Sequence, residues 1–258
     1  MSHQRSHGSR GRVPAPYHAR VMDLGLTDAV AIVTASSKGL GLGTAKALSA
    51  EGAKVVLCAR DEARLRAAAD ALPGETLAIA ADVTDPATPA RLVDAALERF
   101  GALHVVVANA GGPPQARALE TDDEGMLAAV NANMLTSIRL VDAAVPHLRA
   151  AGWGRICLIT SNAVKQPIPT LAYSNASRAG LWAWAKTAAQ DLIDDGITLN
   201  LACPGLHATD RVTELGHTGR LGDPDEFGKV VTFLCSRPAG FVSGAALQVD
   251  GAGTLGLL

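Results

Sequence analysis

The sequence predicts a single α/β domain in which a parallel sheet of seven strands carries helices on both faces. Short apolar runs alternate with longer amphipathic segments, several of the apolar runs lack polar alternation, and no linker rich in Pro, Gly or Ser divides the chain. Repeated strand–helix units favour a parallel sheet with right-handed crossovers. Strands without polar alternation are expected where both faces of a sheet are covered. We therefore expect one doubly wound domain over residues 23–258.

Seven apolar runs supply the expected strands. They cover residues 29–34, 54–59, 77–81, 103–108, 155–160, 198–202 and 246–249. The helix after the first strand is expected to begin at Thr44, and further helical patterns cover residues 61–72, 88–100, 172–194 and 224–235. Each helical pattern lies between two strands or next to one, as the doubly wound arrangement requires.

Composition limits the classes of function. The net charge of -2 gives no electrostatic basis for binding nucleic acid or an anionic membrane. Residues 1–22 carry several His and Arg but no apolar stretch like that of a signal peptide, so we expect a disordered N-terminal extension and a cytoplasmic protein. The four cysteines fall in predicted strands and helices without Cys-x-x-Cys spacing. Buried thiols are expected there, with no metal site.

A glycine-rich turn follows the first predicted strand. Residues 34–43 read Thr-Ala-Ser-Ser-Lys-Gly-Leu-Gly-Leu-Gly, and a helical pattern follows. Glycines let a backbone approach a pyrophosphate, and a helix N-terminus offers unpaired N–H groups to it. A tight turn with packing glycines is the alternative. The position directly after the first strand of a strand–helix series favours dinucleotide binding.

This turn resembles the Thr-Gly-x-x-x-Gly-x-Gly motif of the short-chain dehydrogenases/reductases, with Ala35 where the first glycine is usual. Further elements resemble the same family from about Leu24 to the C-terminus, including a closing Val-Asp-Gly at residues 249–251. The resemblance implies a Rossmann fold and a nicotinamide dinucleotide cofactor. The residues that it implies for cofactor contacts are Thr34, Ser36, Ser37, Lys38, Gly39, Leu40, Gly41, Asp82, Val83, Asn109, Ala110, Gly111, Pro204, Gly205 and Thr209.

Charge at the end of the second strand indicates which dinucleotide binds. An NAD enzyme places a carboxylate there, which binds the ribose 2′-OH and repels a 2′-phosphate. Here Ala59 is followed by Arg60, and Lys38 projects from the glycine-rich turn toward the same region. The two cations favour NADP(H). Two alternatives remain: a shift of one residue could bring Asp61 inward, or both cations could be solvated surface charges.

The family's chemistry depends on a tyrosine acid, a lysine four residues later, a serine that polarises the substrate oxygen and an asparagine that anchors a water. Positions i and i+4 share one face of a helix. Ser161, at the end of the fifth predicted strand, resembles the family's serine. Asn133, twenty-eight positions earlier, fits the family's asparagine better than Asn131.

The tyrosine and lysine are altered. Counting thirteen and seventeen residues from Ser161, the usual family spacing, lands on Ser174 and Arg178. Tyr173 lies one position earlier, about 100° around the helix. The chain is similar to a divergent branch of the family that carries Ser-Asn-x-x-Arg here. Arg178 is expected to hold the cofactor ribose as a fixed cation, because an arginine keeps its proton.

Three arrangements of the proton donor remain open. Tyr173 could swing onto the site if the loop at 166–169 shifts the start of the helix by one residue. Ser174 and Ser161 could bind the substrate oxygen while water or the substrate supplies the proton. The site could also bind NADP(H) without useful turnover. Nearby Lys165 and Lys186 are weaker substitutes for the missing lysine.

The sequence therefore predicts an NADP(H)-dependent oxidoreductase that interconverts a ketone or oxo group and an alcohol by hydride transfer, with atypical acid–base residues. The alternative is a catalytically impaired dinucleotide-binding or scaffold protein of the same fold. The expected partner is a small-molecule carbonyl compound or alcohol. From the resemblance we also expect a homotetramer or homodimer.

Overall fold

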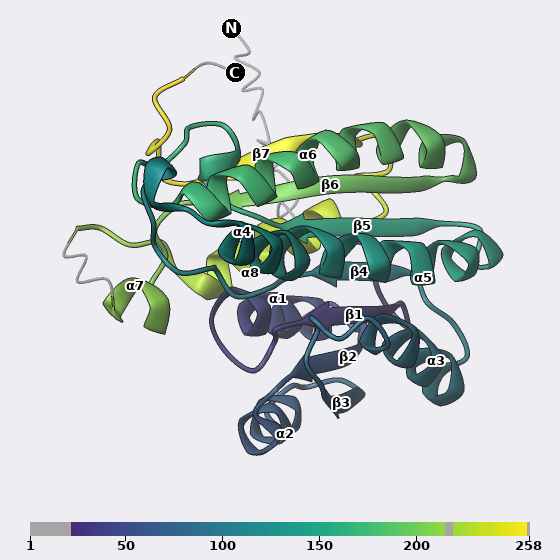
Figure 1. The fold of residues 1–258 in the computed structure, drawn as a ribbon. Helices are drawn as coiled ribbons and strands as arrows, with labels where there is room; N and C mark the ends of the chain where they lie inside the picture. Colours follow the sequence, from purple (N-terminus) through teal and green to yellow (C-terminus); the bar gives the residue numbers. More distant parts are fainter. Residues whose placement is uncertain (1–21, 215–218, 257–258) are drawn as a thin grey trace, which may run out of the picture.

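A computed structural model describes residues 22–214 and 219–256; the expected extension over residues 1–22 lies outside them, apart from Met22. Within these residues, seven parallel strands form one sheet in the order β3-β2-β1-β4-β5-β6-β7 (Figure 1). The strands are β1 (Val30–Thr34), β2 (Lys54–Ala59), β3 (Thr76–Ala80), β4 (Val105–Ala108), β5 (Gly154–Ile159), β6 (Ile197–Pro204) and β7 (Ala246–Val249). The predicted fold class is confirmed, and each strand boundary lies within two residues of its expected place.

The helices of the described residues connect these strands. They are α1 (Gly39–Ala50), α2 (Glu62–Asp70), α3 (Thr88–Phe100), α4 (Asp123–Val130), α5 (Thr136–Ala150), α6 (Ala172–Leu192), α7 (Asp210–Glu214) and α8 (Pro224–Leu234). A π-helical turn, η2 (Asn131–Leu135), joins α4 to α5. Short 3₁₀ turns are η1 (Ala118–Glu120), η3 (Asn162–Val164) and η4 (Ile193–Asp195).

Two apolar layers hold the helices on opposite faces of the sheet. Alternate residues of β1 point to each face: Val30 and Ile32 pack with α3, α5 and α6, whereas Ala31 and Val33 pack with α1, α2 and α8. Figure 1 shows the same arrangement, with α7 lying apart from both layers. Because both faces are covered, the strands need no polar alternation.

The first helix begins at Gly39, five residues before the expected start at Thr44. Within this helix, the glycine-rich segment packs closely against α8. A Cβ atom on Gly43 would lie 2.2 Å from the Pro224 carbonyl oxygen, and one on Gly228 would lie 2.2 Å from the Gly43 carbonyl oxygen. Gly43 is therefore a helical residue at a close crossing of α1 and α8, although the glycine-rich segment suggested a loop.

The order of the strands reverses between β1 and β4. In open α/β sheets, ligands bind outside the carboxyl ends of the strands at such a switch point. The glycine-rich turn follows β1, and Asn109, Ala110 and Gly111, which were predicted to contact the cofactor, follow β4. Both predicted elements thus lie where this topology places a ligand.

All four cysteines are buried and unpaired, as predicted. Among the described residues, no helix is long and apolar enough to cross a membrane.

Candidate functional site

The glycine-rich turn has a backbone that few residue types could adopt. Ala35 has a φ of +47° and Gly39 a φ of +57°. A Cβ atom on Gly41 would lie 2.3 Å from the Ala35 carbonyl oxygen and 2.9 Å from Asn109 Nδ2. Position 35 is in the left-handed region that glycine favours, so its alanine is strained by about 1–2 kcal/mol.

Ser36 is predicted to contact the cofactor, but its side chain lies inside the protein. Its side chain is fully buried, and its hydroxyl donates to the Val33 carbonyl oxygen at 2.8 Å and accepts from the Cys58 N–H at 3.1 Å. The hydroxyl therefore joins β1 to β2. Ser37, Leu40 and Ala110 are partly exposed, and Gly111 is exposed, at the same end of the sheet.

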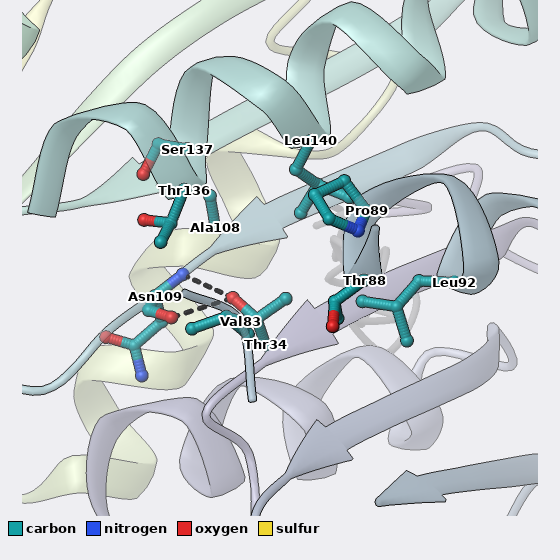
Figure 2. Close-up of a pocket in the computed structure, with 10 residues that line it drawn as sticks. All are labelled: Thr34, Val83, Thr88, Pro89, Leu92, Ala108, Asn109, Thr136, Ser137 and Leu140. Atoms are coloured by element: carbon teal, nitrogen blue, oxygen red, sulfur yellow. Dashed lines mark hydrogen bonds between the residues drawn. The ribbon is translucent and has the colours of Figure 1, made fainter. Parts of the chain in front are cut away.

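Thr34 and Asn109 join the ends of β1 and β4. The Thr34 hydroxyl donates to the Asn109 carbonyl oxygen at 2.7 Å and accepts from the Asn109 N–H at 2.8 Å (Figure 2). The Asn109 amide nitrogen donates to the Ala35 carbonyl oxygen at 3.3 Å. A small cavity of about 10 Å³ lies beside this junction, with Val83 and Thr88 on one side and Thr136 and Ser137 on the other (Figure 2). Asn109 thus fixes the shape of the turn.

The segment after β6 meets the glycine-rich turn. Pro204 is the last residue of β6, and Gly205 lies so close to Asp250 that an added Cβ would be 2.7 Å from the Asp250 Cβ. Farther along, the Thr209 Cγ2 atom lies 3.3 Å from the place of a Cβ on Gly39. The structure therefore brings Thr209 against the turn, as a contact shared by one ligand would require.

Cations gather beside the start of α1. Lys38 and Arg64, which is in the first turn of α2, are exposed and share one carboxylate, whereas Arg60 is exposed near Asp82. The carboxylate of Asp210 lies 2.6 Å from Lys38 Nζ and 3.9 Å from Arg64 Nη1. Sequence reasoning missed Arg64 and Asp210, because residues so far apart carry no local signal of contact.

Asp61 does not take the inward position that the alternative required. Its carboxylate accepts from the Arg64 N–H at 3.0 Å and caps α2. Asp82 follows β3 and accepts from the Thr84 N–H at 2.9 Å and the Thr84 hydroxyl at 2.8 Å. These hydrogen bonds lower the pKa of Asp82. The end of β2 therefore presents Arg60 without an inward carboxylate.

Helix α6 brings the predicted catalytic residues together. It packs against η2, which contains Asn133, and against η3, which Ser161 caps. The Ser161 hydroxyl accepts from the Ala163 N–H at 3.1 Å and donates to Asn162 Oδ1 at 3.3 Å. Ser161 follows β5 by two residues and remains partly exposed.

Ser174 and Arg178 form a buried pair on one face of α6. Arg178 Nε donates to the Ser174 hydroxyl at 3.2 Å, and Nη1 donates to the Ile159 carbonyl oxygen at 3.3 Å, at the end of β5. Burial lowers the pKa of the Arg178 guanidinium to about 10. Among the described side chains, no ion pair involves Arg178. A buried cation without a carboxylate partner is suited to bind a polar ligand.

Asn133 lies in the π-helical turn. Its amide nitrogen donates to the Ala129 carbonyl oxygen at 3.2 Å, while Oδ1 is buried without a hydrogen-bond partner among the described residues. Such turns are frequent at functional sites, and a buried oxygen without a partner has room for one more donor. Neither feature could be predicted from the residue type alone.

Tyr173 is held away from the Ser174–Arg178 pair. Its hydroxyl accepts from the Asp122 N–H at 3.1 Å and donates to Asp122 Oδ1 at 3.2 Å. The ring lies over the first turn of α4, where a Cβ on Gly125 would be 2.5 Å from the hydroxyl oxygen. Tyr173 thereby joins the start of α6 to the start of α4.

The loop at 166–169 does not shift the start of α6, which begins at Ala172. The side chain of Asn175 holds this loop by accepting from the Ile168 N–H at 3.2 Å and donating to the Ile168 carbonyl oxygen at 2.8 Å. In the structure, Tyr173 therefore does not take the position at the site that the first of the three arrangements requires. Of the two lysines, Lys165 lies over the Trp182 ring, and Lys186 donates to the Gly244 carbonyl oxygen at 3.0 Å.

Known proteins that are similar in sequence identify the family of this chain. A family profile described as Enoyl-(Acyl carrier protein) reductase matches residues 34–254. The 3-oxoacyl-[acyl-carrier-protein] reductase of Synechocystis sp. is 34% identical over 243 residues, which cover 88% of this chain and 97% of that protein. The chain belongs to the short-chain dehydrogenase/reductase family. The predicted family is confirmed, and the chain is an oxidoreductase of this family.

Two solved structures of short-chain dehydrogenases/reductases bear on the site. L-sorbose reductase from Gluconobacter frateurii, complexed with NADPH and L-sorbose, has a TM-score of 0.84 and 31% identity and covers 92% of this chain and 100% of its own. A short-chain oxidoreductase from Pseudomonas aeruginosa, described as containing an atypical catalytic center, has a TM-score of 0.85 and 27% identity. It covers 90% of this chain and 99% of its own.

Proposed function

We propose that the protein is an NADP(H)-dependent oxidoreductase that interconverts a ketone or oxo group and an alcohol, with Ser161, Ser174 and Arg178 in the roles of the usual serine, tyrosine and lysine. The observation that supports this most strongly is the contact between Ser174 and Arg178 on the face of α6 that also reaches the end of β5. The Pseudomonas aeruginosa structure, 27% identical to this chain, is described as containing an atypical catalytic center, which supports a site without the usual residues.

The residues present fit a dinucleotide. Gly41 lets the first turn of α1 lie against the backbone of the glycine-rich turn, since an added Cβ would be 2.3 Å from the Ala35 carbonyl oxygen. The N-terminus of α1 has neither a side-chain cap nor an acidic residue in its first turn. Its N–H groups and dipole favour an anion such as a pyrophosphate. Lys38 and Arg60 supply positive charge for a 2′-phosphate, and the G. frateurii relative is complexed with NADPH.

The chain's own residues would then act on the substrate oxygen. When bound, NADP(H) supplies or accepts the hydride. Hydrogen bonds from the hydroxyls of Ser161 and Ser174 would stabilise negative charge on the oxygen. Arg178 stays protonated at neutral pH, because burial leaves its pKa at about 10, and so provides a fixed positive charge rather than a proton relay. In this arrangement water or the substrate supplies the proton.

The experiment that tests this proposal is NADPH oxidation across a panel of ketones and quinones. Wild-type protein should turn over at least one carbonyl substrate. Ser161→Ala should lower kcat by about 100-fold, the usual effect of removing one donor to a developing oxyanion. If NADPH binds while no substrate turns over and Ser161→Ala changes nothing, the protein is the alternative, a non-catalytic dinucleotide-binding or scaffold protein.

A matched pair of variants separates the two candidate hydroxyls. Ser174→Ala removes the hydroxyl that contacts Arg178, and Tyr173→Phe removes the one that contacts Asp122. We expect Ser174→Ala to lower kcat by at least tenfold, as for loss of a donor to the oxygen, and Tyr173→Phe to change it by less than about threefold. A large loss in Tyr173→Phe alone would restore tyrosine as the acid.

The remaining expectations belong to the same proposal. Direct measurement of Kd for NADPH and NADH should show tighter binding of NADPH, and clearly tighter NADH binding would contradict the cofactor assignment. The substrate is a small-molecule carbonyl compound or alcohol. We also propose a cytoplasmic location and assembly as a homotetramer or homodimer.

A further inference from the structure

One carboxylate joins the cations of the proposed 2′-phosphate subsite. Asp210 Oδ2 lies 2.6 Å from Lys38 Nζ and 3.9 Å from Arg64 Nη1. Lys38 immediately precedes α1, Arg64 lies in the first turn of α2, and Asp210 is the first residue of α7. Three elements that are far apart in the sequence therefore meet at this acidic side chain.

The position of Asp210 follows from its neighbour. Thr209 lies against the glycine-rich turn, with its Cγ2 atom 3.3 Å from the place of a Cβ on Gly39. This contact holds the start of α7 over the turn and directs Asp210 to the same side as Lys38. The Asp210 carboxylate accepts a hydrogen bond from Lys38 Nζ, so it occupies a donor that an incoming anion would need.

The ion pair between Lys38 and Asp210 is exposed to solvent, so another anion can replace the carboxylate. The side chains of Lys38 and Asp210 are 54% and 59% exposed, and that of Arg64 is 52% exposed. Surface ion pairs of this kind contribute little to stability, so an anion entering from solvent can replace the carboxylate. A phosphate monoester carries more negative charge than a carboxylate and has three acceptor oxygens, which favours it at a pair of cations.

We propose that Asp210 is an internal counter-ion of the 2′-phosphate subsite, which occupies Lys38 and Arg64 in the free protein, weakens binding of NADP(H) and narrows its preference over NAD(H). The proposal rests on the proposed function, because it takes the cofactor to be a dinucleotide. Arg64 thereby becomes a specificity-determining residue together with Lys38 and Arg60. An adenosine with a 2′-phosphate must displace Asp210 or bind beside its charge, and either route costs affinity.

The test compares wild-type protein with Asp210→Asn, using adenosine 2′,5′-bisphosphate and 5′-AMP as probes in titration calorimetry. The asparagine keeps the shape of the side chain and removes its charge. We expect Asp210→Asn to bind the bisphosphate about 3- to 10-fold tighter, the scale of one exposed charge pair, and 5′-AMP within about twofold of wild type. NADPH and NADH should follow the same pattern.

A matched control is Asp225→Asn. Asp225 is an exposed carboxylate at the start of α8, 3.1 Å from Lys46 Nζ, and its loss changes the net charge by the same amount. It should leave binding of both probes unchanged. If Asp225→Asn tightens the bisphosphate as much as Asp210→Asn does, net charge is the cause and the proposal fails.

The gain in affinity for the bisphosphate must also depend on Lys38 and Arg64. Lys38→Ala and Arg64→Ala should each weaken the bisphosphate without affecting 5′-AMP, and adding Asp210→Asn to Lys38→Ala should restore much less affinity than it adds to wild type. Equal or weaker bisphosphate binding by Asp210→Asn, in a protein that binds NADPH, overturns this proposal alone. Failure of wild-type protein to bind either dinucleotide overturns the proposed function as well.

Discussion

At the scale of single residues, the proposed site differs from that of the usual family member in the group that carries the positive charge. Arg178 is a buried cation whose hydrogen bonds go to Ser174 and to the end of β5. A lysine at this place offers a compact ammonium that can lose its proton, whereas a guanidinium offers a planar set of donors that keeps it. In the proposed assignment, serine in place of tyrosine and arginine in place of lysine would therefore change the chemistry together.

The pH dependence of kcat should show this difference. Burial lowers the pKa of Arg178 to about 10, so the guanidinium remains protonated throughout the neutral range and loses its proton only as the pH rises through that value. Serine hydroxyls do not ionise there. We expect kcat, measured with a substrate that does not titrate, to be flat from about pH 6 to 9. A limb with a midpoint inside that range would contradict a Ser174–Arg178 site.

The left-handed backbone of Ala35 leads to a testable prediction about stability. Its φ of +47° lies in the left-handed region, which costs an alanine about 1–2 kcal/mol relative to glycine. Ala35→Gly should therefore raise the free energy of unfolding by about 1 kcal/mol and Tm by about 2–4 °C, as measured by calorimetry. Ala151→Gly is the control, because Ala151 has an ordinary φ of -76°, and it should lower Tm.

At the scale of elements, the crossing of α1 and α8 depends on two glycines whose backbones touch. A Cβ on Gly43 would lie 2.2 Å from the Pro224 carbonyl oxygen. Helix propensity alone predicts that Gly43→Ala stabilises α1 by about 1 kcal/mol. Overpacking predicts the opposite sign, a loss of about 1–3 kcal/mol, and we expect the loss in denaturant unfolding. Gly219→Ala, at an open position, should change little, and a stabilised Gly43→Ala would contradict the close crossing.

Strands were predictable because a parallel sheet covered on both faces makes each strand an apolar run, such as residues 54–59. The start of α1 was not, because its glycines indicate a loop until the packing against α8 is known. The order Ser161, Ser174, Arg178 could be counted along the chain. The contact of Tyr173 with Asp122 could not, since it joins residues 51 positions apart. Sequence spacing thus locates the side chains of one helix face, but not the partners that long-range packing gives them.

At the scale of the whole molecule, large apolar side chains are exposed on α8, on β7 and in the segment between them. Phe241 is 94% exposed, and Phe233 of α8 and Leu247 of β7 are each 40% exposed. Large exposed apolar side chains are common on surfaces that another protein covers. We expect light scattering to give the mass of a dimer or tetramer, and a monomeric mass at micromolar concentration would contradict the proposed assembly.

The central claim is that Ser174 and Arg178 replace the usual tyrosine and lysine in register. A crystal structure of the protein with NADP⁺ tests it most directly, through the two distances from nicotinamide C4 to the hydroxyls of residues 173 and 174. We predict that the Ser174 hydroxyl is the nearer, with Arg178 on the ribose and Tyr173 still bonded to Asp122. A Tyr173 hydroxyl that has left Asp122 and lies at nicotinamide C4 would contradict the claim.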